Sequence, residues 1–462
     1  MALVFERIVT EGLGDLSYLI GDDESGLAAV IDPRADVAVY QQLAQQHKVS
    51  ISHILQTHIH EDFLSGAVAL AHHFAGASLY MRHVEDASYG YGHEEISDGD
   101  RLELGSVILT ARATPGHTPE HTSYVVCEKK RPSDPYAVFS GGSLLVNAVG
   151  RSDLLGPEVA QRLIAEQYRT LYTFYLGLPD GVILHPTHGH GSPCGADIGD
   201  RLSSTIGYER RYNPFLQHAT AESFKEFAFS RLSAKPTYYG RLKEANTAGY
   251  GQPHLPPVPA LTVEKFQAAT MAENTIVIDV RNLHAFAGGH IPRSLNVGGA
   301  PELSIWAGWM VDAQKKILLV MADDTDVHQI VSLFVRTGFT QFAGYLVGGM
   351  KAWANAGMRL SLIMPMPVQQ LRQRSSVGCL IDVRAADEWE KGHIPGAIHI
   401  FLPELLTKIS SIDKTKPVTT YCATGYRASI AASLLKAAGF EHVEIVPGSW
   451  TAWRNAGYPE EK

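Results

Sequence analysis

Four histidines in the first half of the chain occupy similar places near the ends of short apolar runs, and three of them stand beside Gly or Thr. These residues are His58, His60, His117 and His188. In the segment Thr57–Asp62, the first two are separated by one residue, so in extended chain they face the same side, with Asp62 behind them. Imidazole suits zinc and iron, and open catalytic sites use three protein ligands. The pattern therefore predicts a catalytic or ancestral metal site.

A cysteine near the other end of the chain has a different setting. The segment Cys422-Ala423-Thr424-Gly425-Tyr426-Arg427 follows a predicted strand and opens a predicted helix. Backbone N–H groups and the positive dipole end of a helix, together with Arg427, would stabilise a thiolate or persulfide anion. Gly425 lets the loop curl so that its amides face inward. A buried structural cysteine would not require Gly and Arg at these positions, so we expect Cys422 to be a reactive thiol.

The elements around Cys422 belong to an internal repeat. Ile278–Arg281 returns as Ile381–Arg384, and Gly289–Pro292 returns as Gly392–Pro395. A period of about 100 residues fits a duplicated small domain. Each copy alternates strands with helices, which predicts a parallel sheet covered on both faces. The predicted strands are Thr275 to Val280 and Lys316 to Met321 in the first copy, and Leu380 to Val383 and Pro417 to Tyr421 in the second.

The histidine-rich part has many strands and fewer helices, which predicts two sheets flanked by helices. The predicted strands are Leu16 to Gly21, Ala28 to Asp32, Ile54 to Gln56, Val107 to Ala111, Ser123 to Val126, Ala137 to Phe139 and Val182 to Leu184. The predicted helices are Val37 to His47, Ser65 to Phe74 and Gly156 to Leu176. A Pro-rich linker, Gly251–Pro259, and a second boundary near Ile363–Pro367 give expected domains at 1–250, 260–360 and 365–462.

Composition narrows the class of protein. A chain of 462 residues with 39 Lys and Arg against 48 Asp and Glu has a net charge of -9, which argues against a nucleic-acid binder or a polybasic membrane anchor. No apolar run approaches the ~18 residues of a spanning helix, and no signal peptide is expected. Four cysteines cannot form a disulfide framework, so a reducing, cytoplasmic setting is expected.

These motifs resemble known families. Thr57-His58-x-His60-x-Asp62, with Pro115-Gly116-His117 and His188, resembles the metallo-β-lactamase fold of the glyoxalase II type. The repeat, with Cys422-x-x-Gly-x-Arg427, resembles rhodanese domains. The whole chain is similar to bacterial persulfide dioxygenase–rhodanese fusions. The resemblance implies a multidomain α/β protein, with an αββα sandwich and helical tail followed by two parallel-sheet rhodanese domains.

The resemblance also implies an activity. In these fusions one Fe(II) per chain, held by two His and one Asp, serves to oxidise a thiol persulfide of the glutathione type to sulfite, and the two His correspond to His58 and His117. His60, Asp62 and His188 are further candidates for the metal or its surroundings. Cys422 would then carry sulfane sulfur, Arg427 would bind an anionic donor or acceptor, and the loop residues Ala423, Thr424, Gly425 and Tyr426 would hold the outer sulfur. The expected partners are small thiol persulfides, sulfite and thiosulfate, and the chain could form a homo-oligomer.

Two departures from the family pattern leave alternatives open. Phe63 stands where binuclear zinc members carry a His, and Gly142 stands where the metal-binding Asp is expected. Asp153 belongs to a separate family segment and is not assigned as a ligand. The metal could be held by two His with water, substrate sulfur or His60. The alternatives are a glyoxalase II-like zinc thioesterase, or a sulfurtransferase whose N-terminal domain binds no metal.

Three other features of the sequence give weaker indications of function. Arg151 could contact a substrate carboxylate or be structural. Tyr208, with Arg210 and Arg211, could hold a thiol such as glutathione or lie on a solvated helix face. The first repeat has no cysteine after its second strand, and its loop, Ala322–Asp326, carries three acids that would repel anionic sulfur compounds. We expect this copy to be catalytically silent.

Overall fold

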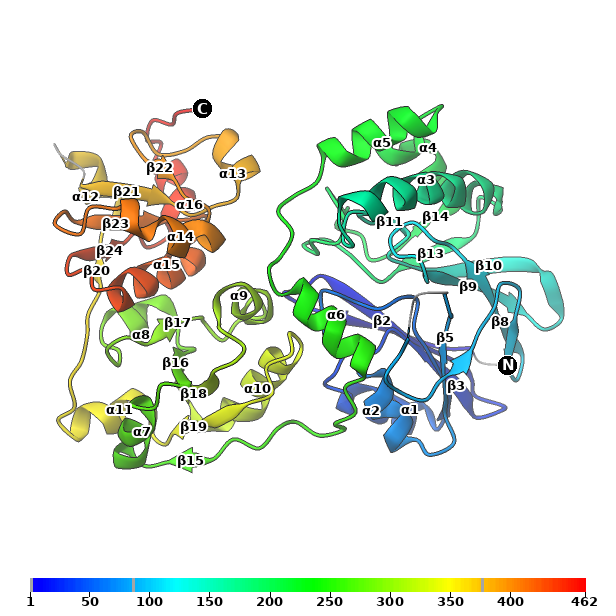
Figure 1. Cartoon of the computed structure of the whole chain (residues 1–462), viewed down its shortest axis with the longest axis horizontal. Coiled ribbons are helices and arrows are strands. Elements are labelled where there is room, and N and C mark those ends of the chain that lie inside the picture. The colour runs from blue at the N-terminus through cyan, green and yellow to red at the C-terminus, as the bar shows by residue number, and fades with distance from the viewer. Residues whose placement is uncertain (1–2, 85–87, 375–377) are drawn as a thin grey trace. The chain divides into compact units, whose positions relative to one another are not determined.

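The computed structural model describes residues 3–84, 88–374 and 378–462. The chain divides into two compact units (Figure 1). One comprises Met1–Leu255 with Phe334–Phe339, and the other comprises Pro256–Leu333 with Thr340–Lys462. Among the described helices, none combines the length and the apolar character needed to cross a lipid bilayer.

Two sheets form the centre of the first unit. In the first sheet the described strands follow the chain order: β1 (Leu3–Thr10), β2 (Asp15–Asp22), β3 (Leu27–Ile31), β4 (Ser50–Leu55), β5 (Ser78–Met81) and β6 (Glu94–Glu95). In the second sheet the order is β14 (Ser204–Thr205), β13 (Ile183–Pro186), β10 (Arg131–Gly141), β9 (Thr122–Glu128), β8 (Val107–Ala113) and β7 (Arg101–Leu104). A short hairpin joins β11 (Leu144–Leu145) to β12 (Ala148–Val149).

Helices cover the outer faces of both sheets. The helices of this unit are α1 (Ala38–His47), α2 (Ala67–His73), α3 (Pro157–Thr173), α4 (Ile206–Tyr212), α5 (Ala221–Ser230) and α6 (Tyr239–Ala248), with 3-10 turns η1 (Tyr175–Gly177) and η2 (Pro214–Leu216). Alternation along β9 shows the layers: Tyr124 packs between the sheets with Tyr18 of β2, whereas Val125 shares a core with Leu171 of α3. On the other side Tyr40 of α1 packs on the first sheet. The predicted αββα sandwich is confirmed.

The second unit contains both repeats, and each repeat has a parallel sheet. The first has the order β15 (Ala260–Leu261), β19 (Phe342–Leu346), β18 (Lys316–Val320), β16 (Thr275–Asp279) and β17 (Leu295–Asn296). The second has the order β20 (Met364–Pro365), β24 (Val443–Ile445), β23 (Val418–Tyr421), β21 (Cys379–Asp382) and β22 (Ile398–His399). The helices of the first repeat are α7 (Val263–Thr270), α8 (Leu283–Ala287), α9 (Leu303–Met310), η3 (Asp324–Asp326), α10 (Val327–Val335) and α11 (Gly349–Asn355). Those of the second are α12 (Val368–Gln373), α13 (Ala386–Glu390), η4 (Leu402–Glu404), α14 (Leu405–Lys408), η5 (Ile409–Ser411), α15 (Tyr426–Ala437) and α16 (Ser449–Asn455).

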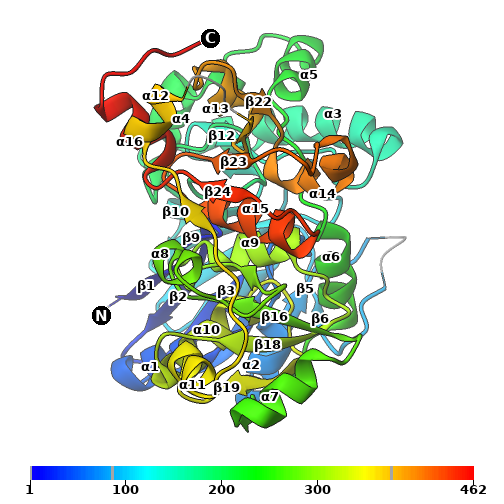
Figure 2. The same ribbon diagram turned by 90° about the vertical axis from the view of Figure 1, so that its left-hand side faces the viewer.

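In the second repeat, helices lie on both faces of the sheet. Leu371 of α12 and Trp453 of α16 share a core with Tyr421 of β23, and Figure 2 shows these two helices side by side. The adjacent Thr420 faces the opposite side, where its hydroxyl donates to the carbonyl of Ala428 in α15. The predicted parallel sheets with helices on both faces are therefore confirmed, and the helix that follows Cys422 lies on the face opposite α12.

Candidate functional site

Three of the predicted histidines meet at one edge of the first unit. His58 follows β4, His117 follows β8 and His188 follows β13. Both β8 and β10 run antiparallel to β9, and β13 runs parallel to β10, so β8 and β13 end at the same edge of the second sheet. One ligand nitrogen from each histidine lies within 4.8 Å of the other two. All three residues are buried, with exposed fractions of 1% or less.

Each of these rings uses Nδ1 for a hydrogen bond. His117 Nδ1 donates to the carbonyl of Arg151 at 2.7 Å, and His188 Nδ1 lies 3.0 Å from a carboxylate oxygen of Asp15. His58 Nδ1 lies 2.8 Å from the Thr57 hydroxyl. Because that hydroxyl donates to Asp32, it can accept the Nδ1 proton. The arrangement leaves Nε2 as the free nitrogen of each ring, which is the usual pattern for histidines that bind metal.

The protonation of the rings differs with their neighbours. Burial and the nearby His60 and His117 hold the pKa of His58 well below its usual value, and burial lowers the pKa of His117 to about 3. Both are therefore neutral at pH 7, as metal ligation requires. Burial opposes a charge on His188, but the carboxylates of Asp62 and Asp15 raise its pKa to about 10. These two acids favour a cation, whether a proton or a metal ion, at this ring.

His60, Asp62 and His188 form a second group whose ligand atoms lie within 4.8 Å of one another. His60 Nε2 lies 3.1 Å from Asp32, and its ring stacks on Phe63 with centroids 4.3 Å apart. The phenyl ring that replaces a second-site histidine thus packs directly on one of the candidate ligands. The two groups share His188, and the second is a set of two His and one carboxylate, the combination used by many non-haem iron sites.

The donor set fits a divalent metal ion. Among the described residues, Nε2 of His117, Nε2 of His188 and Oδ1 of Asp62 are buried without a hydrogen-bond partner, whereas Oδ2 of Asp62 lies 3.0 Å from Nδ1 of His188. Buried polar atoms are normally paired, so several unpaired ones in one place indicate a missing partner. Lone-pair nitrogens and carboxylate oxygens together suit zinc or iron.

Gly142 lies against two of the histidines, His117 and His121. A Cβ added to it would be 2.3 Å from Cδ2 and 2.7 Å from Nε2 of His117, so the imidazole fills the space of the expected Asp side chain. Its backbone N–H donates to Nε2 of His121 at 3.0 Å. The expected carboxylate ligand therefore has no substitute at this position, and the nearest ligand group there is His117 itself.

Two other candidates lie outside the histidine cluster. The guanidinium of Arg151 is bound by Asp153 and by the carbonyls of Pro193 and Ser233, as expected for a structural arginine. Its own carbonyl orients His117. Tyr208 packs under Arg201, whose guanidinium lies 3.9 Å from the ring centroid.

Sequence reasoning missed three polar residues of the site. Asp32 accepts hydrogen bonds from Thr57 and Thr187, Asp15 contacts His188, and His121 accepts from Gly142. Asp32 had a recognisable signal, because an acid directly after the buried apolar run Leu27–Ile31 lies at a strand end. Asp15 and His121 had no comparable signal.

In the second unit, Cys422 directly follows β23 and is 1% exposed. Its Sγ accepts a hydrogen bond from the N–H of Gly425 at 3.1 Å. Gly425 has a φ of 122°, a conformation that favours glycine, and α15 begins at the next residue. The loop therefore directs an amide toward the sulfur, as the sequence predicts.

Arg427 is held by an acid that the sequence did not indicate. Its two terminal nitrogens donate to both carboxylate oxygens of Glu388 at 2.5 and 2.8 Å. Burial opposes the charge of Glu388, but Arg427 holds the pKa of this carboxyl below its usual value. The positive charge beside Cys422 is thus largely neutralised within the protein.

The register of the two sheets identifies the counterpart of Cys422. Asp279 pairs with Val320 in the first repeat, and Asp382 pairs with Tyr421 in the second. Val320 therefore corresponds to Tyr421, and the next residue, Met321, corresponds to Cys422. The predicted strand Lys316 to Met321 is one residue too long, since β18 ends at Val320.

Comparisons with known proteins agree with the two-part organisation. The rhodanese-like domain family matches residues 262–356 and 367–456. The persulfide dioxygenase ETHE1 of Bos taurus is 29% identical over 211 residues, which cover 45% of this chain and 74% of that protein. A hydroxyacylglutathione hydrolase of Neisseria gonorrhoeae is 29% identical over 214 residues, covering 41% of this chain and 77% of that protein.

A solved structure described as a metallo-β-lactamase from Staphylococcus aureus is similar over 75% of this chain and 99% of its own chain, with a TM-score of 0.67 and 27% identity. The chain is therefore a fusion of a metallo-β-lactamase-fold part, homologous to persulfide dioxygenases, with two rhodanese-like domains.

Proposed function

We propose that this protein is a sulfur-metabolism enzyme that oxidises a low-molecular-weight thiol persulfide, of the glutathione type, to sulfite and moves sulfane sulfur through Cys422. The observation that carries the proposal is the Cys422 loop, whose Gly425 N–H donates to the sulfur at the start of a helix. Similarity of the N-terminal part to persulfide dioxygenases supports the oxidative half.

One Fe(II) ion would be held by His58, His117 and His188, or by His188 with His60 and Asp62. When bound, the ion would supply redox chemistry with oxygen and a Lewis-acidic position for the substrate sulfur. The protein's own part is to fix the rings: the Arg151 carbonyl and the Thr57 hydroxyl set the tautomers of His117 and His58. Asp15 and Asp62 supply compensating negative charge.

Sulfur transfer through Cys422 needs no metal. Sulfite attacks the outer sulfur of the Cys422 persulfide, the S–S bond breaks, thiosulfate leaves, and Cys422 remains as a thiolate. The Gly425 amide and the dipole of α15 stabilise that thiolate.

Each half has its own test. Oxygen uptake with glutathione persulfide should fall at least about a hundredfold in His58→Ala, because a metal ligand is lost. Equal uptake in the wild type and in His58→Ala would overturn the ligand assignment.

Transfer of sulfur from thiosulfate should disappear in Cys422→Ser and persist in Cys379→Ser, a control cysteine on β21. Undiminished transfer in Cys422→Ser would refute the carrier role.

Two alternative functions have specific support. Gly142 removes the expected carboxylate ligand, and the similarity to a hydroxyacylglutathione hydrolase has the same percentage identity as that to the dioxygenase. The alternatives are a zinc thioesterase and a metal-free N-terminal part attached to a sulfurtransferase. Elemental analysis of freshly purified protein together with turnover of S-lactoylglutathione separates them from the iron enzyme.

A further inference from the structure

The loop that carries His58, His60 and Asp62 lies between β4 and α2. Its residues 57–65, all of which the structure describes, belong to no helix or strand, and every one of them is buried. We call this segment the ligand loop. Buried backbone N–H and C=O groups need hydrogen-bond partners, and a loop without regular secondary structure must find them in other parts of the protein.

Asn246 of α6 supplies three of these partners (Figure 1). Its Nδ2 donates to the carbonyls of His60 and Phe63, and its Oδ1 accepts from the N–H of Ser65, all at 2.8 Å. Because a carbonyl can only accept and a backbone N–H can only donate, these contacts fix the orientation of the side-chain amide. Asn246 is 3% exposed, so both of its donors are committed to the ligand loop.

A second contact joins α6 to the same loop. Nζ of Lys243 lies 2.9 Å from the carboxylate of Glu61, which is 3% exposed. Lys243 precedes Asn246 by three residues, so both side chains lie on the same face of the helix. The residues that flank Asp62 in the chain are therefore attached to α6 from both sides.

Asp62 connects this clamp to the histidine cluster. Its Oδ2 lies 3.0 Å from Nδ1 of His188, which leaves Nε2 of that ring for a metal ion. A carboxylate at the second nitrogen of a metal-binding histidine sets the tautomer and the orientation of the ring. Helix α6 also contacts the segment that follows His188, because the Tyr239 hydroxyl lies 3.3 Å from Sγ of Cys194.

We propose that Asn246 is a positioning residue of the metal site. It holds the carbonyls before and after Asp62, so that the Asp62 carboxylate is fixed where it orients His188. Lys243 supports the same loop through Glu61. The inference rests on the metal site of the proposed function, and it makes α6 a working part of that site although none of the candidate ligands lies on this helix.

Co(II) is the probe, because its visible absorption reports the geometry of the ligands. In an anaerobic titration of the metal-depleted full chain, Asn246→Ala should weaken Co(II) binding about ten- to hundredfold and shift the absorption bands. The control is Asn213→Ala in the same unit. Asn213 is also fully buried, donates to the carbonyl of Ala148 and accepts from the N–H of Phe215. This control should lower the melting temperature to a similar extent and leave the Co(II) spectrum unchanged.

A milder variant keeps the test decisive if Asn246→Ala does not fold. The side chain of Lys243 is 32% exposed, so Lys243→Gln should fold and weaken Co(II) binding about two- to fivefold. Lys225→Gln is the matched control, since that side chain has the same exposure and pairs with Glu222.

Three results would count against the inference. They are an unchanged Co(II) affinity and spectrum in Asn246→Ala, the same spectral change in Asn213→Ala, and, where Asn246→Ala does not fold, an unchanged affinity in Lys243→Gln. A wild-type chain that binds no Co(II) would refute the metal site of the proposed function itself, and the inference with it.

Discussion

The imidazole of His117 fills the space that a side chain at Gly142 would need, with Cδ2 only 2.3 Å from the position of a Cβ. Real Cβ contacts are essentially never this short, so the ring or the backbone would have to move before Asp could be accommodated. The histidine cluster therefore leaves no room for the expected carboxylate at position 142. The ligand nitrogen of His188 lies within 4.8 Å of those of His58 and His117, and we propose this ring as the third ligand of the metal.

Gly142→Asp should consequently damage the site rather than restore the family ligand set. Overpacking a buried position costs about 1–3 kcal/mol, so we expect a lower melting temperature and, because His117 is displaced, at least about tenfold weaker Fe(II) binding. Differential scanning calorimetry and anaerobic titration measure the two effects. Gly76→Asp, at a glycine with no atom within 4 Å of its added Cβ, is the control. Tighter Fe(II) binding with unchanged stability would contradict the prediction, because it would show that the His117 ring is easily displaced.

The bidentate pair between Arg427 and Glu388 should limit the affinity for anionic sulfur donors. Glu388→Gln removes the neutralising charge and leaves a polar side chain of similar size, so the guanidinium can attract thiosulfate more strongly. We expect the KM for thiosulfate to fall about two- to fivefold. Asp387→Asn, at an exposed neighbour that pairs with Lys391, serves as the control in the same sulfur-transfer assay. A higher KM in Glu388→Gln would mean that the pair is needed to position Arg427.

The conformation of Gly425 should be essential to the sulfur loop. Gly425→Ala combines backbone strain at a φ of 122° with a contact of 2.8 Å to Leu283. We expect a loss of roughly 1–3 kcal/mol in stability and at least about tenfold slower transfer, since the amide that donates to Cys422 is displaced.

Gly439→Ala separates these two causes. It has a positive φ of 89° with no atom within 4 Å of the added Cβ, so it should show strain without the transfer defect. Adding Leu283→Ala to Gly425→Ala should restore part of the transfer rate. No recovery in the double variant would assign the defect to strain alone.

The features of the site that can be predicted from the sequence are those set by neighbouring residues in the chain. The positions of His58, His117 and His188 at strand ends were predictable, because short apolar runs preceded each of them. The Cys422 loop was predictable from Gly425 and Arg427.

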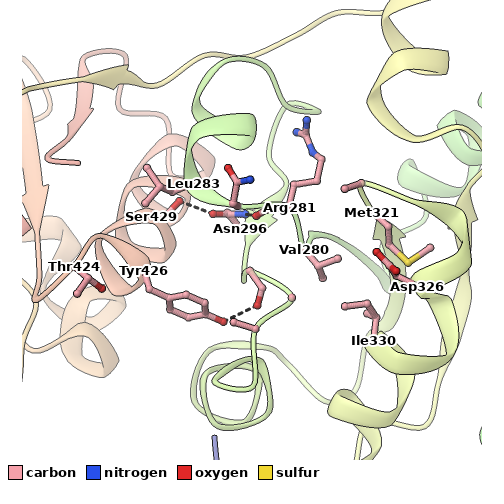
Figure 3. Close-up of a pocket in the computed structure, with 15 residues that line it drawn as sticks. Val280, Arg281, Leu283, Asn296, Met321, Asp326, Ile330, Thr424, Tyr426 and Ser429 are labelled. Atoms are coloured by element: carbon pink, nitrogen blue, oxygen red, sulfur yellow. Dashed lines mark hydrogen bonds between the residues drawn. The ribbon is translucent and has the colours of Figure 1, made fainter. Parts of the chain in front are cut away.

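The features that could not be predicted from the sequence depend on contacts between residues that are far apart in the chain. Glu388 is 39 residues from Arg427 along the chain, and nothing in the local pattern pairs them. Met321 emerged as the counterpart of Cys422 only from the strand register. The cavity that Met321 and Thr424 line required two repeats to pack together (Figure 3).

We propose that His58, His117 and His188, which follow three separate strands, hold one cation although Gly142 replaces the expected Asp. Anaerobic titration of the metal-depleted chain with Fe(II), followed by elemental analysis after desalting, measures this binding. We predict about one iron per chain in the wild type and loss of most of it in both His117→Ala and His188→Ala. A wild-type chain that retains no iron, or variants that retain as much as the wild type, would contradict the claim.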